Sequence, residues 1–253
     1  MKPEVSIITC SYNAEGYIED TARSIGRQTF TNYEWLVIDD GSTDSSPGII
    51  RELAARDKRI KPYLHRKNRG PVAVRNFGME RARGRFIAIV DSDDLWLPEK
   101  LEKQVAFMKE NRIPLSYTAY KKIRKCGKLK SGLTVPVPEM VSYRRILKSD
   151  SIMASSAMYD TDITGPITQP FGAPVGKDDL FFFLMILRRH GPARGVRDDL
   201  ARLRLHGDSI TGNKLKAARR QWRFYRRVIG LSPLKAISYF FVYAVKGFIK
   251  YLL

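Results

Sequence analysis

The stretch RFIAIVDSDD, residues 85–94, decides the fold, because an apolar run leads directly into a dense group of carboxylates. The run from Phe86 to Val90 is apolar and rich in β-branched residues, which predicts a buried strand. The carboxylates of Asp91, Asp93 and Asp94 follow the end of that strand. Carboxylates next to a buried strand are costly unless water, a cation or a hydrogen-bond donor compensates them.

A hard divalent cation is one such partner for the Asp91–Asp94 group. Mg²⁺ and Mn²⁺ prefer carboxylate oxygens and share their remaining coordination positions with phosphate. Taken alone, a D-x-D motif is also explained by a solvated turn that caps the next helix. The place of the motif in the rest of the chain favours the cation site.

Strand and helix signals alternate along the first hundred residues. The predicted elements are strands at residues 5–9, 35–38, 60–64 and 85–90, and helices near 17–25, 45–56, 71–82 and 98–108. This alternation predicts βαβ units, a largely parallel sheet and therefore an α/β fold. Ligands of such sheets bind beyond the carboxyl ends of the strands, and both Asp39-Asp40 and Asp91–Asp94 fall there.

Four segments in this order resemble glycosyltransferase family 2. They are VSIITCSYN (5–13), VIDDGSTD (37–44), NRGPVAVRNFGMERARGRFIAIVDSDD (68–94) and LWLPEKLEKQ (95–104). The resemblance is dense over residues 4–112 and thinner to about residue 227. It implies the GT-A fold, with a Rossmann-like, mostly parallel central sheet. It also implies inverting transfer from a nucleotide sugar, in a single displacement from a UDP- or dTDP-sugar to a hydroxyl acceptor.

The resemblance also implies roles for individual residues. Asp93 binds a divalent metal, Mn²⁺ or Mg²⁺, that bridges the donor diphosphate, and Asp91 holds the ribose or a water on the metal. Turn or wall packing is the alternative role for Tyr12, Asn68 and Asn76. Cys10 stands where the family usually has Pro, which alters loop stiffness more than chemistry. The other implied nucleotide-sugar contacts are Thr9, Tyr12, Asn13, Asp39, Asn68, Arg75 and Asn76.

A second acidic pair, Asp178-Asp179, precedes the apolar run Leu180–Leu187, and Arg188-Arg189 follow it. This pattern predicts a buried helix with acidic residues at its N-terminus and basic residues at its C-terminus, as the helix dipole favours. Capping of the helix alone would therefore explain the acidic pair. By the resemblance, such a pair carries the catalytic base. We assign the base to Asp179 and keep Asp178 as the second choice, because the register can slip by one residue.

The resemblance implies a basic segment after this helix that reaches the diphosphate. Arg202 and His206 in RLRLH are the residues that match it. Alternating Arg and Leu also fit a strand with one polar face at an exposed sheet edge, which is the alternative explanation. Residues 113–175 carry no pattern that names acceptor-binding side chains.

The net charge of +19 is concentrated in the second part of the chain. Residues 1–100 carry 16 Lys and Arg against 15 Asp and Glu, whereas no acidic residue follows Asp208. A basic nucleic-acid-binding protein is therefore an alternative function, and a catalytically inactive nucleotide-sugar-binding relative is another. The nearly neutral charge of residues 1–100 argues against nucleic-acid binding, because the α/β fold would then have no part in the function.

The composition excludes a disordered, collagen-like or disulfide-built protein, since 43% of residues are hydrophobic and only two are Cys. The N-terminal residues lack a charged segment before an apolar one, so we expect a cytoplasmic protein. We divide the chain into a nucleotide-sugar-binding half (1–112), an acceptor-side half with the base (113–212) and a basic helical tail (213–253).

The tail predicts a helix that lies on a membrane surface. Its stretch from Leu234 to Leu253 is mostly apolar, but Lys235, Lys246 and Lys250 interrupt it and fall on one narrow side of the helix. The longest run without a charge is Ala236–Val245, well short of the ~20 residues that span a bilayer. We therefore expect attachment to an anionic membrane, where a lipid-linked or surface-polysaccharide acceptor is assembled. Packing of this helix on the domain is the alternative.

Overall fold

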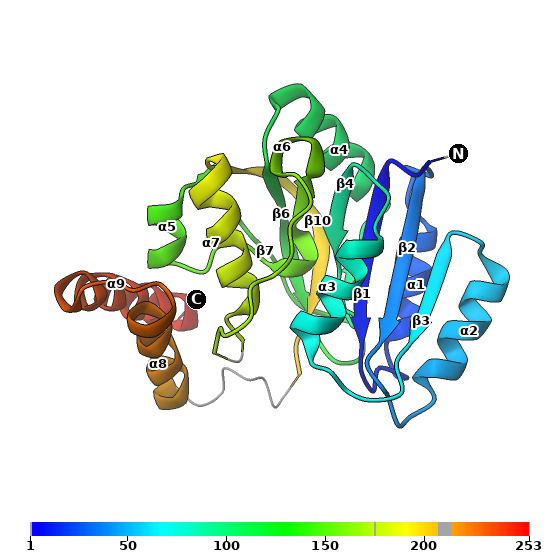
Figure 1. Ribbon diagram of the computed structural model, residues 1–253, viewed down its shortest axis with the longest axis horizontal. Coiled ribbons are helices and arrows are strands. Elements are labelled where there is room, and N and C mark those ends of the chain that lie inside the picture. The colour runs from blue at the N-terminus through cyan, green and yellow to red at the C-terminus, as the bar shows by residue number, and fades with distance from the viewer. Residues whose placement is uncertain (1, 175, 207–213, 253) are drawn as a thin grey trace.

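The computed structural model describes residues 2–174, 176–206 and 214–252. Within these ranges it describes the side chains of all residues except 214–216 and 246–252. These residues form a ten-stranded sheet with helices on both faces (Figure 1). The strands are β1 (Val5–Ser11), β2 (Tyr33–Asp39), β3 (Ile60–Leu64), β4 (Phe86–Ile89), β5 (Leu95–Trp96), β6 (Leu115–Ile123), β7 (Leu129–Val135), β8 (Met140–Val141), β9 (Met158–Asp160) and β10 (Ala193–Arg204).

Helices connect and cover these strands. The α-helices are α1 (Ile18–Gly26), α2 (Ser46–Arg56), α3 (Pro71–Arg81), α4 (Lys100–Asn111), α5 (Tyr143–Lys148), α6 (Thr161–Thr164), α7 (Asp178–His190), α8 (Lys214–Arg223) and α9 (Pro233–Leu252). A 3₁₀ turn, η1, covers Ala154–Ser156, and a π-helical turn, η2, covers Phe224–Val228.

The strand order is β3-β2-β1-β4-β9-β6-β10-β5, with β7 paired to β6 and β8 paired to β10. Strands β1 to β4 pair in parallel, and β6 and β10 run in the same direction, while β9 is antiparallel to both of its neighbours. The predicted α/β class, with a mostly parallel core sheet and a helical C-terminal extension, is confirmed. One sheet joins the predicted nucleotide half to the predicted acceptor half.

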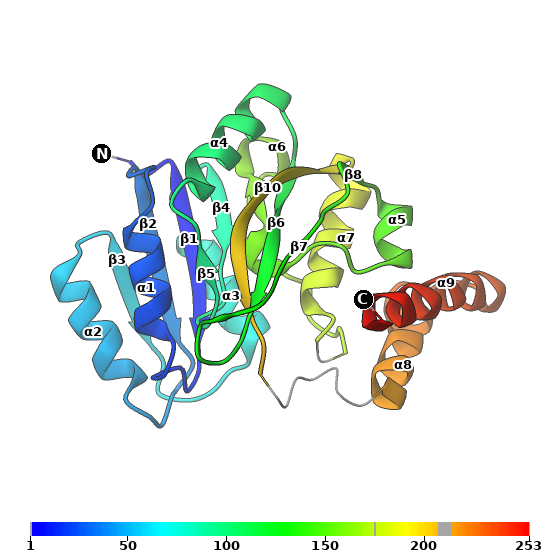
Figure 2. The same ribbon diagram turned by 180° about the vertical axis from the view of Figure 1, so that it is seen from behind.

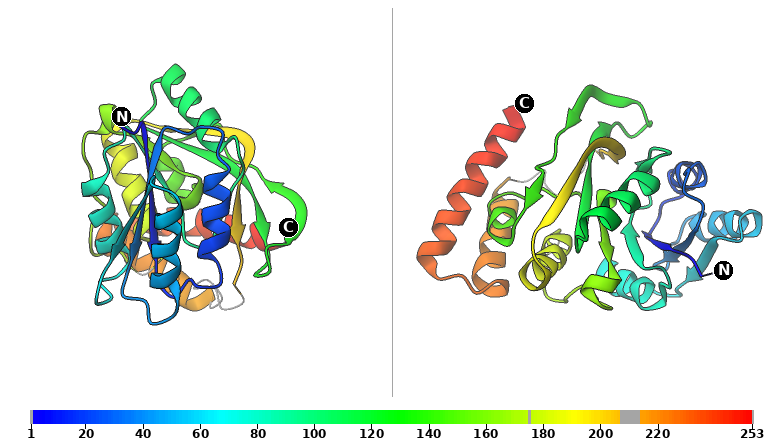
Figure 3. Two further views of the ribbon diagram at one scale, coloured as in Figure 1. Left: turned by 90° about the vertical axis from the view of Figure 1, so that its right-hand side faces the viewer. Right: turned by 90° about the horizontal axis from the view of Figure 1, so that it is seen from above.

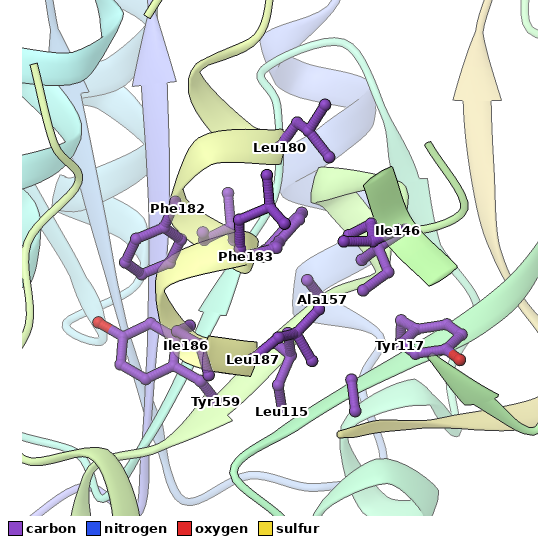
Figure 4. Packing of buried hydrophobic residues seen from close by; sticks show 14 of the residues in the cluster. Leu115, Tyr117, Ile146, Ala157, Tyr159, Leu180, Phe182, Phe183, Ile186 and Leu187 are labelled. Atoms are coloured by element: carbon purple, nitrogen blue, oxygen red, sulfur yellow. The ribbon is translucent and has the colours of Figure 1, made fainter. Parts of the chain in front are cut away.

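Successive residues of the central strands face opposite layers of the core. In β1, Ile8 packs in the layer with α3 and α7, whereas Ile7 packs in the layer with α1 and α4. Figure 2 shows α1, α2 and α4 on the face opposite to α3 and α7. In Figure 4 the apolar side of α7 packs on β6, β9 and α5 through Leu180, Phe182, Phe183, Ile186 and Leu187.

For residues 202–206, the alternative explanation of an exposed edge strand does not agree with the structure. Strand β10 ends at Arg204 and is an interior strand, because it pairs with β6 on one side and with β5 and β8 on the other. Arg204 is buried as a result. On one side of this interior strand the Arg of the alternation at position 204 is a buried cation.

The tail forms two helices at the end of the molecule opposite β3 (Figure 3). The inner side of α9 packs on the domain through buried Ala236, with Tyr239 and Phe240 beside it. The predicted alternative, packing on the domain, is therefore true of this side. Within the described residues, no helix combines the length and the apolar character that crossing a membrane requires.

Candidate functional site

The acidic turn after β4 separates its carboxylates into two kinds. Asp94 is buried, and it accepts hydrogen bonds from Ser155 Oγ at 2.5 Å and from the Arg204 backbone N–H at 2.8 Å. Burial raises the pKa of Asp94 well above its usual value, and Asp91 and Asp93 raise it further. Asp94 thus fastens the turn to η1 and β10, and leaves Asp91 and Asp93 to face the site.

Asp93 meets the end of β10. His206 Nε2 lies 2.6 Å from Asp93 Oδ2, and the ring of His206 contacts Tyr17 edge-on. The buried Arg204 donates from Nε to the Asp93 carbonyl at 2.7 Å, and its other end reaches Asp20. The predicted metal residue and the predicted residue His206 are therefore brought together.

Arg75 of α3 links the acidic turn to the start of α7. Its guanidinium is buried, donates from Nη1 to Asp179 Oδ1, and lies 3.4 Å from Asp91 Oδ1 through Nη2. Burial lowers the pKa of Arg75, but Asp179 and Asp91 outweigh this effect and the pKa is raised. Desolvation raises the pKa of Asp91 to about 6, with Arg75 opposing and Asp179 adding to the shift.

The two candidate bases at the start of α7 have different surroundings. Asp179 Oδ1 accepts from Arg75 and, at 3.3 Å, from Gln169 Nε2, while both contacts leave Oδ2 open. Asp178 makes no side-chain contact with Arg75, and partial burial raises its pKa. Of the two residues, Asp179 is the one that the structure joins to Asp91.

The side-chain amide of the predicted residue Asn76 binds the protein backbone. Both ends of its buried amide bind the backbone of Gln169, at 2.6 Å to the N–H and 2.9 Å to the carbonyl. Asn76 therefore holds the segment that precedes α7. Through this contact it places Gln169, and with it Asp179.

The predicted nucleotide residues gather around the ends of β1 and β2. Asp39 is buried and accepts from the Ser42 backbone at 2.9 Å and from Ser42 Oγ at 2.5 Å. Asn13, with a φ of 49°, accepts from Thr43 N–H at 2.9 Å. Tyr12 is 51% exposed beside them, so its ring is available to a ligand.

Three other predicted residues have different surroundings. Thr9 is fully buried, and its hydroxyl accepts from Trp35 Nε1 at 2.8 Å. Asn68 is exposed and its side chain accepts from Gly70 N–H at 3.1 Å. Arg202 pairs with Asp199 at 2.5 Å, so it does not join the acidic turn.

Sequence reasoning missed Arg204, Ser155 and Gln169. Arg204 stands in the same RLRLH segment, and the alternation that selected Arg202 also includes it. Ser155 accepts from the Asp91 N–H at 3.0 Å, yet it lies in a stretch without pattern. No local signal marks Ser155 or Gln169, because their partners are distant in sequence.

Two cavities open at this end of the sheet. One of about 710 Å³ is lined by Asn13, Tyr17, Thr43 and the β6–β7 turn at Cys126. Another, of about 560 Å³, has Asp179 in its wall. The residues that the structure describes contain no group of three or more His, Cys, Asp or Glu side chains arranged for a metal ion.

Comparison with known proteins agrees with this architecture. The family model described as glycosyl transferase family 2 matches residues 6–156. TuaG of Bacillus subtilis (strain 168), named as a teichuronic acid biosynthesis glycosyltransferase, is 38% identical over 96% of this chain and 95% of its own length. WfgD of Escherichia coli, named as a UDP-Glc:α-D-GlcNAc-diphosphoundecaprenol β-1,3-glucosyltransferase, is 34% identical over 98% of this chain and 94% of its own.

A solved structure shares the fold. TarS of S. aureus, residues 1–349 in complex with UDP-GlcNAc, superposes with a TM-score of 0.70 at 22% identity, and the match covers 96% of this chain and 72% of that one. This agrees with the GT-A fold expected from the sequence. The matches over nearly the whole length show that the chain belongs to glycosyltransferase family 2 and is a glycosyltransferase.

Proposed function

We propose that this protein transfers a sugar, with inversion, from a UDP- or dTDP-sugar to a hydroxyl of a lipid-linked saccharide. The observation that carries the proposal is the buried Arg75, which joins Asp91 on the donor side to Asp179 on the acceptor side. The name of WfgD includes a UDP-sugar donor and a diphosphoundecaprenol-linked acceptor, and the TarS structure holds UDP-GlcNAc. Both names support this choice of substrates.

The open carboxylates suit a divalent cation held together with a diphosphate. Asp93 and Asp91 supply oxygen ligands, and His206 adjoins Asp93 at 2.6 Å. Mg²⁺ and Mn²⁺ bind through one or two carboxylates and complete their shells with phosphate and water, so a larger protein ligand cluster is not required. Such a cation neutralises the charge that builds on the leaving diphosphate. A related mannosyltransferase, PcManGT, was solved with GDP-Man and Mn²⁺.

Asp179 is the proposed base. In the reaction the acceptor oxygen bonds to the anomeric carbon, the bond from that carbon to the diphosphate oxygen breaks, and the hydroxyl proton moves to a carboxylate. Because Arg75 and Gln169 both bind Oδ1, the remaining oxygen Oδ2 is oriented to accept this proton. Arg75 holds the carboxylate in place between turnovers.

Calorimetric titration with UDP and Mn²⁺ tests the donor site. Asp93→Ala is expected to abolish the part of UDP affinity that depends on Mn²⁺ while the far-ultraviolet circular dichroism stays unchanged. Equal UDP affinity in wild type and variant, with and without Mn²⁺, would overturn the proposed metal site. A DNA oligonucleotide in the same titration should give no comparable heat, since the proposal includes no nucleic acid. Sugar transfer distinguishes an active enzyme from an inactive binding relative.

We further propose that the protein works at the inner face of the cell membrane through its tail. Four apolar side chains form an exposed stripe on α9, with exposed fractions of 81% for Leu234, 56% for Ile237, 68% for Phe241 and 41% for Val245. Their spacing places them on one side of the helix, opposite to Ala236. Exposed arginines on α8 and η2, Arg219, Arg223, Arg226 and Arg227, supply positive charge nearby. An apolar stripe with flanking cations is what an anionic lipid surface binds.

A further inference from the structure

The cavity of about 560 Å³ beside Asp179 is built from segments that are far apart in the chain. The turn between β7 and β8 forms an apolar wall with Pro136 and Pro138. The rest comes from β6, α5 and the segment 149–154 that follows it, the start of α7, and α9. Tyr243 is the contribution of α9. The tail therefore completes a cavity that the candidate base also lines.

Two cations line the same cavity, Arg145 of α5 and Lys177 just before α7. Lys177 is only 10% exposed at its side chain; its Nζ lies 3.3 Å from the Tyr243 hydroxyl and 3.8 Å from Asp150 Oδ2. The contact with Asp150 is long, so the ammonium keeps capacity for another anion. Arg145 is exposed and forms no ion pair with the part of the chain that the structure describes.

We propose that this cavity binds the acceptor, and that Arg145 and Lys177 bind the diphosphate that joins its saccharide to the lipid. This inference rests on the proposed function. A diphosphate carries several charged oxygens and favours Arg and Lys donors together. The cavity also holds Asp179, so the diphosphate and the reacting hydroxyl of one acceptor are bound in the same space.

The place of α9 agrees with a lipid-linked acceptor. Tyr243 faces the cavity, whereas the stripe with Leu234 and Phe241 faces away from the domain. A helix is about 10–12 Å across with its side chains, so the cavity lies roughly one helix diameter from the surface on which the stripe would rest. A diphosphate at the membrane surface is therefore within reach, with the lipid chain left in the bilayer.

Titration with farnesyl diphosphate, in excess EDTA and with the full-length protein, tests this inference. Wild type should bind this probe, and farnesol, which lacks the diphosphate, should bind far more weakly. Arg145→Gln and Lys177→Gln should each weaken binding of farnesyl diphosphate roughly 10-fold or more, as expected for loss of a charge-assisted contact. Arg144→Gln is the matched control, because Arg144 is exposed on the same helix and does not line the cavity.

The donor site is measured separately in the same proteins. Arg145→Gln should retain wild-type affinity for UDP with Mn²⁺, and Asp93→Ala should retain wild-type affinity for farnesyl diphosphate. Wild-type affinity for farnesyl diphosphate in both Arg145→Gln and Lys177→Gln would overturn the inference, as would its loss in Asp93→Ala. Failure of the wild type to bind either UDP or dTDP with Mn²⁺ would instead overturn the proposed function.

Discussion

A single buried guanidinium organises the chemistry of this site at the scale of one residue. Arg75 holds Asp179 through one nitrogen and lies beside Asp91 through another. The buried cation opposes the rise in the pKa of Asp91 that desolvation causes, and its contacts fix the orientation of both carboxylates. The proposed base, Asp179, is thereby positioned before an acceptor binds.

Asp179→Asn keeps the shape of this residue but removes the proton acceptor. We expect the turnover number to fall roughly 10²–10⁴-fold, with donor affinity nearly unchanged. Steady-state transfer and calorimetric titration of UDP measure the two quantities. Asp178→Asn is the control, since Asp178 does not touch Arg75, and it should retain most activity. If only Asp178→Asn loses turnover, the base is assigned one residue too late.

The buried lysine Lys100 affects the stability of the fold. Lys100, the first residue of α4, is fully buried, and its Nζ lies 3.7 Å from the centre of the Trp96 ring. Among the residues that the structure describes, this Nζ has no hydrogen-bond partner. Desolvation lowers the pKa of Lys100 well below its usual value. Between the folded and the unfolded pKa, the unfolded chain binds more protons, so the stability of the wild type rises with pH.

Lys100→Met removes this buried amine and fills its space. The free energy of unfolding near pH 7 should rise by roughly 1–3 kcal/mol, because an unpartnered polar group leaves the core. Its increase with pH should also become shallower. Urea unfolding between pH 6 and 9 measures both effects. Lys103→Met, on the exposed side of the same helix, should change stability far less, and equal effects in the two variants would refute this account.

At the scale of elements, the segment between α6 and α7 is positioned by one amide. Asn76 of α3 binds the backbone of Gln169 through both ends of its side chain, and Gln169 contacts Asp179. Helix α3 thus holds both the partner of the base and the segment that leads to it. Substitutions in α3 should therefore alter the position of the start of α7.

Asn76→Ala leaves two buried backbone groups of Gln169 without their partner. We expect the free energy of unfolding to fall by roughly 1–3 kcal/mol. Asn68→Ala is the matched control, because Asn68 is exposed and makes one local contact with Gly70. Urea unfolding of the two variants gives the comparison. A smaller loss for Asn76→Ala than for Asn68→Ala would contradict the assigned role.

The elements also show how far the sequence alone can lead. Strands β1, β2 and β4 were predictable because each contains a short apolar run that leads to a turn residue or carboxylate. The β6–β9 region was not, because its order depends on pairings between distant segments, as in Arg194 opposite Ser116. The same holds for the site. Asp93 and Asp179 carry local patterns, whereas Ser155 acts on Asp91 from 64 residues away.

At the scale of the whole molecule, the sheet carries the proposed donor residues, and the helical tail packs on α5 at the far end of the molecule. The inner side of α9 contributes Ala236 to the core and Tyr243 to the cavity. Deleting residues 232–253 would remove α9 together with the side chains that it buries. Because that deletion would uncover the core, exposed point variants give a sharper test.

The double variant Ile237→Gln/Phe241→Gln changes only the exposed stripe of α9. Burying an apolar side chain of this size in lipid contributes about 1.5–3 kcal/mol, so the loss of two should weaken vesicle binding at least roughly 100-fold. Sedimentation with phosphatidylglycerol vesicles at low salt measures the effect, and UDP affinity should stay at the wild-type value. Ser238→Gln, also exposed on α9, is the control.

Phosphatidylcholine vesicles and high salt should weaken wild-type binding, since each Lys or Arg near an anionic leaflet adds about 1 kcal/mol that salt screens. If the wild type fails to sediment, or if the double variant sediments as the wild type does, the tail is not a membrane anchor.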